Sequence, residues 1–289
     1  MLKIIVQCFH GNFKSDKEKI ISYKGAIAAK RKYSLKLSGR CNMRNYKEEF
    51  DNRVAFIKEL LAKSGAEGIV YGNSGGKDCT LAAILCKAAC DNTVGIVMPC
   101  TSKRNYELDM DDAKKLADAY GIETRVADLT PVKEALVKSA LGATKVITKS
   151  SDVNIAPRLR MTVLYTIAAS ENRLVVGTGN RSEMFVGYFT KWGDGGCDFN
   201  PISDLTVTEV YEFLSYLKAP EFILTKAPSA GLFDGQTDED DMGVSYSEID
   251  AYINGEQIDA EKAEIVARMH SRSAHKRAPI ARFKENADG

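Results

Sequence analysis

The sequence predicts an α/β protein with a doubly wound parallel sheet and additional helices at its C-terminal end. Short apolar segments alternate with helical segments between residues 45 and 176. Glycine-rich loops follow the first and the last of these apolar segments, and the chain beyond residue 204 shows helical periodicity only. The 289 residues are 44% hydrophobic and 27% charged, which is enough apolar material for a sizeable core.

The elements of the sheet region follow from periodicity and from their glycine and proline boundaries. Apolar residues recur at helical spacing from residue 45, and Gly65 and Gly68 end that helix. Pro131 suits the first turn of a later helix. The predicted elements are helices at 45–64, 80–90, 105–120, from 131 onward and at 157–171, and strands at 69–71, 94–98, 122–127 and 173–176.

Strands that alternate with helices in this way form right-handed βαβ units in a parallel sheet. Ligands of such sheets bind at the carboxyl ends of the strands. The loops at 72–78 and 177–183 both follow strands, so we expect both at this edge. The chemistry of the protein is predicted to lie there.

The chain changes character beyond residue 187. A long loop rich in glycine and aspartate at 188–204 precedes helices predicted at 206–217, 246–254 and 259–272. The acidic run DEDD at 238–241 lies between two of these helices, and taken alone it favours a solvated lid segment over a metal site.

Residues 1–42 differ from the rest in charge. They carry a net charge of +8, and because the whole chain carries +1 the remainder carries −7. A basic arm is one interpretation, as a tail for nucleic acid or membrane. We favour an extension that is disordered or absent from the native protein, with translation from Met43 and a main domain at 43–289.

Composition also limits which cellular compartment and which classes of binding partner are expected. The overall charge of +1 gives no general attraction to nucleic acid or to a membrane, and no stretch is long enough to span a bilayer. The seven cysteines are odd in number and form no C-x-x-C pair, which favours a reducing cytoplasm over a disulfide framework or a zinc site.

The first glycine loop belongs to the segment YGNSGGKDCT, residues 71–80. Gly72 and Gly76 are one residue too close for a Walker A loop, and Asp78 stands where that loop has a hydroxyl. Backbone N–H groups that converge at a helix N-terminus favour a phosphate. Asp78 would repel that phosphate unless a cation such as Mg²⁺ lay between them. A glycine-rich turn with Asp78 as a simple helix-start carboxylate is the alternative.

The segment S-G-G-K-D-C at 74–79 resembles the S-G-G-x-D-S loop of the ATP pyrophosphatases, a group with several different substrates. The rest of the chain resembles the ammonia-dependent NAD synthetases within that group. This second resemblance rests on VVGTGNRSE at 175–183, VGYFTKWGDGGCDFNP at 186–201, APSAGL at 227–232, GQTDEDDMG at 235–243 and HKR at 275–277.

The resemblance implies an adenine nucleotide alpha hydrolase-like fold and a ligase reaction. ATP, as co-substrate, adenylates the nicotinate carboxylate of deamido-NAD (nicotinate adenine dinucleotide) and releases pyrophosphate. Ammonia then displaces AMP to give NAD. A homodimer in the cytoplasm and a requirement for Mg²⁺ are also implied. A chain of 289 residues has no room for an added glutaminase domain, so free ammonia is the expected donor unless a separate glutaminase subunit supplies it.

The resemblance also assigns roles to individual residues. Asp78, Glu183 and Lys191 are the expected catalytic residues, and Asp78 and Glu183 the expected magnesium ligands. The expected ATP-binding residues are Gly72, Asn73, Ser74, Gly75, Gly76, Lys77, Asp78, Cys79, Thr178 and Ser229. The expected deamido-NAD-binding residues are Arg158, Lys191, Asp198, His275 and Lys276, each of which would pass for an ordinary surface residue outside these motifs.

Two positions depart from the family pattern. Cys79 replaces a serine, and because a thiol is a weaker hydrogen-bond donor the affinity for phosphate is expected to drop. A thiolate at the helix N-terminus would repel phosphate, so we expect a neutral thiol with no nucleophilic role. Val207 stands where the family often has an ATP-contacting lysine, so either ATP binding is weaker or a charge comes from elsewhere. An ATP pyrophosphatase with another acceptor and a non-catalytic nucleotide-binding paralogue are the alternatives to the synthetase.

Overall fold

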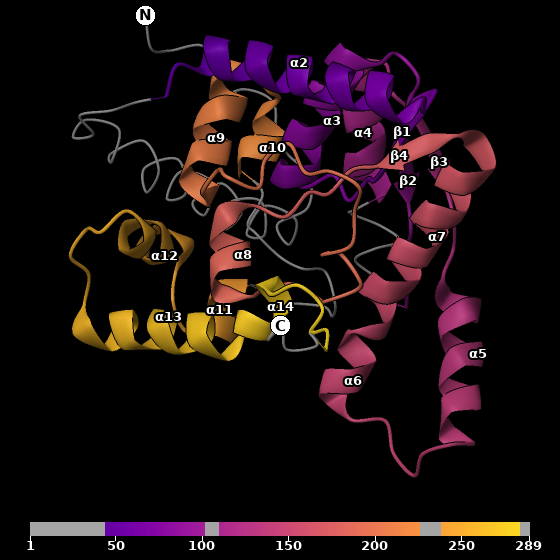
Figure 1. Ribbon diagram of the computed structural model, residues 1–289, viewed down its shortest axis with the longest axis vertical. Coiled ribbons are helices and arrows are strands. Elements are labelled where there is room, and N and C mark those ends of the chain that lie inside the picture. Colours follow the sequence, from indigo (N-terminus) through magenta and orange to yellow (C-terminus); the bar gives the residue numbers. More distant parts are fainter. Residues whose placement is uncertain (1–43, 102–109, 226–237, 284–289) are drawn as a thin grey trace, which may run out of the picture.

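A parallel four-stranded sheet forms the centre of the molecule (Figure 1). The computed structural model describes residues 44–101, 110–225 and 238–283. The strands are β1 (Gly68–Gly72), β2 (Thr93–Val97), β3 (Glu123–Val126) and β4 (Arg173–Val175), in the order β3-β2-β1-β4. The predicted fold class is therefore confirmed.

The strand order reverses direction at β1. The chain proceeds from β1 to β2 and β3 on one side and then returns to place β4 on the other side of β1. Val70 of β1 pairs with Val94 of β2 and with Val175 of β4. A reversal of this kind opens a crevice at the carboxyl ends of the two strands, which is where the two glycine loops emerge.

Helices cover both faces of the sheet. Successive residues of β1 point to opposite sides, so Ile69 and Tyr71 join one buried cluster and Val70 joins another. On the first side pack α2 (Tyr46–Ser64), α3 (Lys77–Ala89) and α4 (Met110–Tyr120). On the second side lies α7 (Ile155–Glu171), which contacts β1 and β4 and carries α5 (Thr130–Leu141) and α6 (Lys149–Val153) beside it.

The C-terminal helices surround a third buried cluster. This part comprises α8 (Arg181–Val186), α9 (Val207–Tyr216), α10 (Glu221–Thr225), α11 (Asp238–Met242), α12 (Tyr246–Ile253), α13 (Ala260–Arg272) and α14 (Ala274–Arg277). Tyr211, Tyr246 and Val266 are among the buried residues of the cluster. Helix α9 also packs against α3, which attaches these helices to the sheet.

The longer predicted elements agree with the structure, and the differences are local. Helix α3 begins at Lys77 and not at Thr80, so the glycine loop is shorter than expected. The short helices α6, α8, α10, α11 and α14 were not predicted, because four to six residues are too few to establish a helical period. The start of the helix predicted at 105–120 and the extension at 1–42 lie outside the described residues.

The acidic run at 238–241 forms most of α11 and is not wholly solvated. Asp238 is buried and accepts a hydrogen bond from the hydroxyl of Tyr246 at 3.0 Å. The prediction of a solvated segment is wrong for Asp238, although Asp240 and Asp241 are exposed. In the described part of the chain, no helix combines the length and the apolar character needed to cross a membrane.

Candidate active site

The glycine loop between β1 and α3 is held in one conformation by α4. Asn73 is buried, with its Oδ1 accepting from the Gly75 N–H at 3.2 Å and its Nδ2 donating to the Ala113 carbonyl at 3.1 Å. Gly75 has φ +65°, and a Cβ there would lie 2.6 Å from Asp112 Cβ and 2.8 Å from the backbone nitrogen of Ala113. Glycine is therefore required at this position.

The loop opens onto the N-terminus of α3, which is suited to an anion. Gly76 is the N-cap residue and provides no side-chain hydrogen bond to the first turn. The first-turn N–H groups of a helix have no partner within the helix, so they attract phosphate. The loop therefore leads into a free helix N-terminus, and phosphate binding by residues 72–79 stays a prediction.

The second loop brings Glu183 to the same edge of the sheet. Asn180 caps α8, since its Oδ1 accepts from the Glu183 N–H at 3.0 Å and its own N–H donates to Glu183 Oε2 at 3.1 Å. The Asn180 Nδ2 also donates to Asp78 Oδ1 at 3.1 Å. One asparagine therefore connects the two predicted metal ligands.

Asn180 is absent from the predicted site residues, although a signal for it was present. The pattern N-R-S-E at 180–183 is that of a capping box, in which the first and fourth residues exchange hydrogen bonds. Its bond to Asp78 depends on two loops about a hundred residues apart in sequence, and local pattern alone does not show it.

The charged groups at this junction strongly influence one another. Burial and the neighbouring Asp78 carboxylate raise the pKa of Glu183 well above its ordinary value. Burial lowers the pKa of Lys77, but Asp78, Tyr211 and Glu183 outweigh that effect and raise it overall. The Lys77 ammonium lies 2.8 Å from Asp78 Oδ2, with 6% of the lysine side chain and 17% of the aspartate side chain exposed.

The donor set suits a magnesium ion that is shared with a substrate. Two carboxylates from the first turns of α3 and α8 match the oxygen ligands that Mg²⁺ prefers. Within the described ranges, no group of three or more His, Cys, Asp or Glu side chains is arranged to hold a metal. Phosphate oxygens and water would therefore complete the coordination of such an ion.

Cys79 faces the interior of the loop. Its thiol is 3% exposed, donates to the Gly76 carbonyl at 3.2 Å and accepts from Ser74 Oγ at 3.4 Å. Burial raises the pKa of this thiol, in agreement with the predicted neutral form. A neutral thiol does not repel a phosphate. It is also a poor nucleophile, because the thiolate is the reactive form of cysteine.

The residues expected to bind deamido-NAD mostly have partners within the protein. Lys276 Nζ donates to the Gly187 carbonyl at 2.7 Å and to the Phe189 carbonyl at 2.6 Å, and Lys191 Nζ donates to the His275 carbonyl. These bonds connect α14 with the loop at 187–191. They position the loop, and they leave fewer lysine N–H groups for a ligand.

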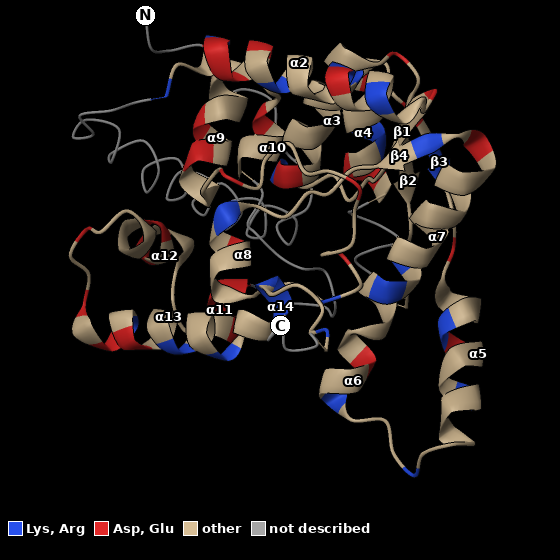
Figure 2. Cartoon of the chain, viewed as in Figure 1, with Lys and Arg blue, Asp and Glu red and all other residues tan. Residues whose placement is uncertain are grey.

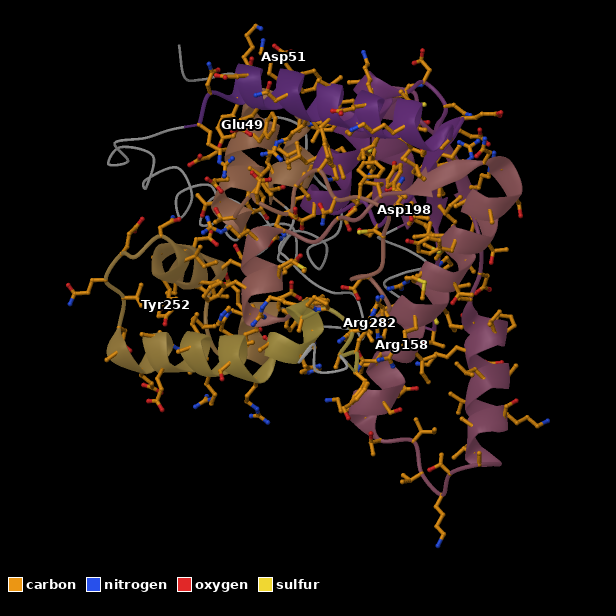
Figure 3. All side chains as sticks on the ribbon, in the orientation of Figure 1. Glu49, Asp51, Arg158, Asp198, Tyr252 and Arg282 are labelled. Carbon is orange, nitrogen blue, oxygen red and sulfur yellow. The ribbon has the colours of Figure 1, made fainter. Side chains whose placement is uncertain are left out.

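Arg158 and Asp198 occupy different surroundings. Asp198 accepts from the Val175 N–H at 2.8 Å and from the Tyr165 hydroxyl at 3.0 Å, so its carboxylate attaches the loop to β4 and α7. Arg158 is exposed near the start of α7 (Figure 3). Basic residues gather on α14 and on this part of α7 (Figure 2), and Arg158 lies close enough to Lys276 to influence its charge.

Three further positions complete the comparison with the sequence. Val207 is fully buried and its N–H donates to Ser182 Oγ at 3.1 Å, so this position places no charge in the site. Thr178 follows β4 in the second loop, as expected. Ser229 lies outside the described residues. Arg277, which was not predicted, donates to the carbonyls of Met184 and Phe185 at the end of α8.

In comparisons with known proteins, a family model and a curated relative indicate the same family. The family model described as NAD synthase matches residues 49–280. The NH(3)-dependent NAD(+) synthetase of Carboxydothermus hydrogenoformans is 46% identical over 235 residues, which cover 81% of this chain and 96% of that protein.

Solved structures resemble this one over most of its length. The NMN synthetase of Francisella tularensis has a TM-score of 0.78 and 38% identity, covering 84% of this chain and 100% of that chain. The NH3-dependent NAD synthetase of Campylobacter jejuni has a TM-score of 0.68 and 28% identity, with the same coverage.

Proposed function

The chain belongs to the NAD synthase family, and on this basis we propose that it is a ligase that amidates the nicotinate carboxylate of deamido-NAD with ammonia, using ATP. The observation that carries the proposal is the junction of Asp78 and Glu183 through Asn180, beside a glycine loop that opens onto a helix N-terminus. A site of this kind suits the departure of pyrophosphate from ATP.

The reaction has two steps. A nicotinate carboxylate oxygen attacks the α-phosphorus of ATP, the bond to the bridging oxygen of the β-phosphate breaks, and pyrophosphate leaves. Ammonia then attacks the acyl carbon, the bond to the AMP oxygen breaks, and the nitrogen loses a proton. A free carboxylate is a poor acyl donor, so the first step provides the leaving group for the second.

The residues of the chain bind and orient the phosphates in the first step. The unpaired N–H groups at the start of α3 receive the β- and γ-phosphates, where negative charge develops as pyrophosphate departs. The Asn73 hydrogen bonds to Gly75 and Ala113 hold these donors in place before the substrate arrives. Preorganised donors of this kind lower the barrier because they need no rearrangement during the reaction.

Asp78 and Glu183 are the residues that would hold Mg²⁺. A magnesium ion in this position would neutralise the charge that develops on the departing pyrophosphate. We further propose that Thr178, Ser229 and Lys77 contribute to the ATP site, and that Arg158, Lys191, Asp198, His275 and Lys276 belong to the acceptor site. The cluster of basic residues on α14 and α7 supports binding of an anionic nucleotide there.

A mononucleotide acceptor is the second candidate. The resemblance to the Francisella tularensis NMN synthetase is the observation that favours it. Nicotinate mononucleotide and deamido-NAD carry the same nicotinate carboxylate and differ in the adenylate half. Both reactions therefore use the same ATP site and differ only in the acceptor site.

We also propose a homodimer. Helix α5 buries none of its residues and projects with α6 beyond the sheet (Figure 1). Val132 and Leu136, one helical turn apart, are 47% and 43% exposed. An exposed apolar helix face of this kind is typical of a subunit interface.

A cytoplasmic location completes the proposal. The five described cysteines, Cys79, Cys86, Cys90, Cys100 and Cys197, are all free, which agrees with a reducing compartment. We propose residues 1–42 as an extension outside the catalytic domain at 43–289, since the family match covers residues 49–280.

The test is a product assay with purified protein, ATP, Mg²⁺ and either deamido-NAD or nicotinate mononucleotide, with ammonium or glutamine as nitrogen donor. We expect NAD, AMP and pyrophosphate in equal amounts with ammonium, and little product with glutamine. A higher kcat/KM for the mononucleotide would favour the second candidate. AMP without amide would favour another acceptor, and ATP binding without turnover would indicate a non-catalytic relative.

A further inference from the structure

Lys77 is a buried cation in an unfavourable position. It is the first residue of α3, where the helix dipole disfavours positive charge, and 6% of its surface is exposed. Burying an ammonium group costs free energy unless a partner compensates for the lost hydration. A lysine here therefore requires a compensating interaction.

The compensation comes from the junction of the two loops. Lys77 Nζ donates to Asp78 Oδ2 at 2.8 Å, while Asn180 donates to the other oxygen, Asp78 Oδ1, at 3.1 Å. The ammonium also lies 5.8 Å from the ring centroid of Tyr211 and 5.5 Å from that of Tyr246, within the range of cation–π attraction. Lys77 thus faces inward, between the phosphate loop and helices α9 and α12.

This arrangement has a consequence for any metal that approaches Asp78. Both oxygens of the Asp78 carboxylate already accept hydrogen bonds, one of them from a full positive charge. Glu183, the second carboxylate, also interacts electrostatically with Lys77. A free divalent cation would meet the repulsion of the lysine at close range in a poorly solvated place.

We propose that Lys77 is the resident counter-ion of the Asp78–Glu183 pair, a positioning residue that keeps the two loops together before the nucleotide binds and weakens the binding of a free divalent cation. Metal then enters together with the phosphates of ATP, whose negative charge offsets the repulsion between the metal and the lysine. This inference rests on the proposed function, since it takes the two carboxylates as metal ligands.

The test measures Mn²⁺ binding to the nucleotide-free protein by electron paramagnetic resonance. We expect Lys77→Met and Lys77→Gln to bind Mn²⁺ about tenfold more tightly than the wild type, because a nearby positive charge is removed. Lys77→Arg keeps the charge, so its affinity is expected to stay within about twofold of the wild type. A double variant, Lys77→Met with Asp78→Asn, is expected to lose the gain.

Lys87→Met is the matched control. Lys87 lies on the same helix and pairs with Asp91 at 3.4 Å, away from the two loops. Its replacement is expected to leave Mn²⁺ affinity unchanged. A second readout is the Mg²⁺ concentration that gives half-maximal amide formation at limiting ATP, which should fall in the neutral Lys77 variants.

Unchanged or weaker Mn²⁺ binding in both neutral variants contradicts the proposal. If Lys77→Met does not fold, as judged by circular dichroism, Lys77→Gln carries the test. If neither folds, Lys77 serves stability alone and the proposal fails. An unchanged Mn²⁺ affinity in a protein that still makes amide overturns only this inference. Tighter Mn²⁺ binding in a protein that makes no amide overturns only the proposed function.

Discussion

At the scale of the residue, the site depends on how Asn180 joins two carboxylates of unequal character. Asp78 is paired with Lys77, whereas the pKa of Glu183 is raised by burial and by Asp78 itself. When two carboxylates lie close together in a poorly solvated place, ionisation of both at once is disfavoured. The ionised form of Glu183 is therefore disfavoured in the folded protein, and Lys77 offsets only part of that effect.

Glu183→Gln should separate the effect of Glu183 on stability from its effect on activity. The glutamine oxygen can still accept from the Asn180 N–H, but the negative charge is lost. We expect kcat/KM to fall by about 100-fold or more, because a metal ligand is removed, while stability at pH 7 is unchanged or higher. Amide formation and urea denaturation measure the two effects. Glu248→Gln, the equivalent capping-box position of α12, should leave activity intact.

The same variant should change how stability depends on pH. The pKa of an unfolded glutamate is about 4.3. The pKa of Glu183 in the folded protein is higher, so between these two values the folded state holds a proton that the unfolded state has lost. The resulting stabilisation is complete below the unfolded pKa and is lost as pH rises through the folded pKa. Relative to the wild type, Glu183→Gln should therefore gain stability as pH rises. A loss over that interval would contradict the raised pKa.

Cys79→Ser should have little effect on the KM for ATP. Because the thiol is directed to the Gly76 carbonyl inside the loop, a hydroxyl can replace it in the same bond. We expect the KM for ATP to change by less than about threefold, since an exchange of one buried hydrogen bond for another is worth about 1 kcal/mol or less. Steady-state kinetics measures this. A tenfold change would mean that the side chain contacts the phosphates directly.

Cys86→Ser is the control for this substitution. Cys86 is fully buried in the apolar core on the same helix. A hydroxyl there should lower the free energy of unfolding by about 1–3 kcal/mol and leave the KM for ATP unchanged.

At the scale of the element, helix α8 carries Glu183 but is too short to be stable alone. Six residues form it, and most of its stability must come from tertiary contacts. Buried Asp250 of α12 accepts from Ser182 of α8 and from both the N–H and the hydroxyl of Thr208 of α9. Arg277 holds the other end of α8 through two of its carbonyls.

Asp250→Ala should loosen this arrangement of three helices. Removal of the carboxylate leaves three donors without an acceptor, at a cost of about 2–4 kcal/mol in the free energy of unfolding. Activity should fall as well, because Ser182 precedes Glu183. Chemical denaturation and the amide assay measure both. Asp259→Ala removes an exposed cap with two N–H bonds and should cost only about 1 kcal/mol; equal costs for the two variants would contradict this role of Asp250.

At the scale of the whole molecule, the projecting pair of α5 and α6 carries the face that we propose as the dimer interface. Val132→Lys with Leu136→Lys places two charges on the exposed apolar face of α5. We expect the proposed dimer to dissociate, because burying two unpaired charges costs several kcal/mol, while each subunit stays folded. Light scattering with size-exclusion chromatography measures the mass. Tyr216→Lys, at a residue with 49% exposure on α9, is the control and should remain dimeric; an unchanged mass in the α5 variant would exclude this face.

A chain that starts at Met43 should keep both activity and stability. The family match begins at residue 49, and Arg44 pairs with Glu209 and Asp204, so the first described residue is already attached to the domain. We expect the melting temperature to stay within about 2 °C of the full chain, because no described ion pair is removed. Thermal unfolding and the amide assay provide the check. A large decrease in either would show that residues 1–42 contribute to activity or to stability.

The location of the site was predictable because parallel strands place their following loops at one edge. The glycine spacing and Asp78 indicated a phosphate loop, and the chain order of β1 and β4 allowed Glu183 to meet it. The internal partners of Lys276 and Asp198 were not predictable, since motifs identify residue types and do not show which hydrogen bonds those residues already make.

The parallel α/β fold, the family and the two loops proposed to carry the chemistry could be read from the sequence, because these depend on local periodicity, on glycine positions and on motifs in fixed order. The folded structure was needed to show that Asn180 joins Asp78 to Glu183, that Lys77 is a buried counter-ion, and that α9, α12 and α14 hold α8 in place. These features arise from hydrogen bonds and charges between segments far apart in the chain. Burial sets their strength, and burial is a property of the folded molecule alone.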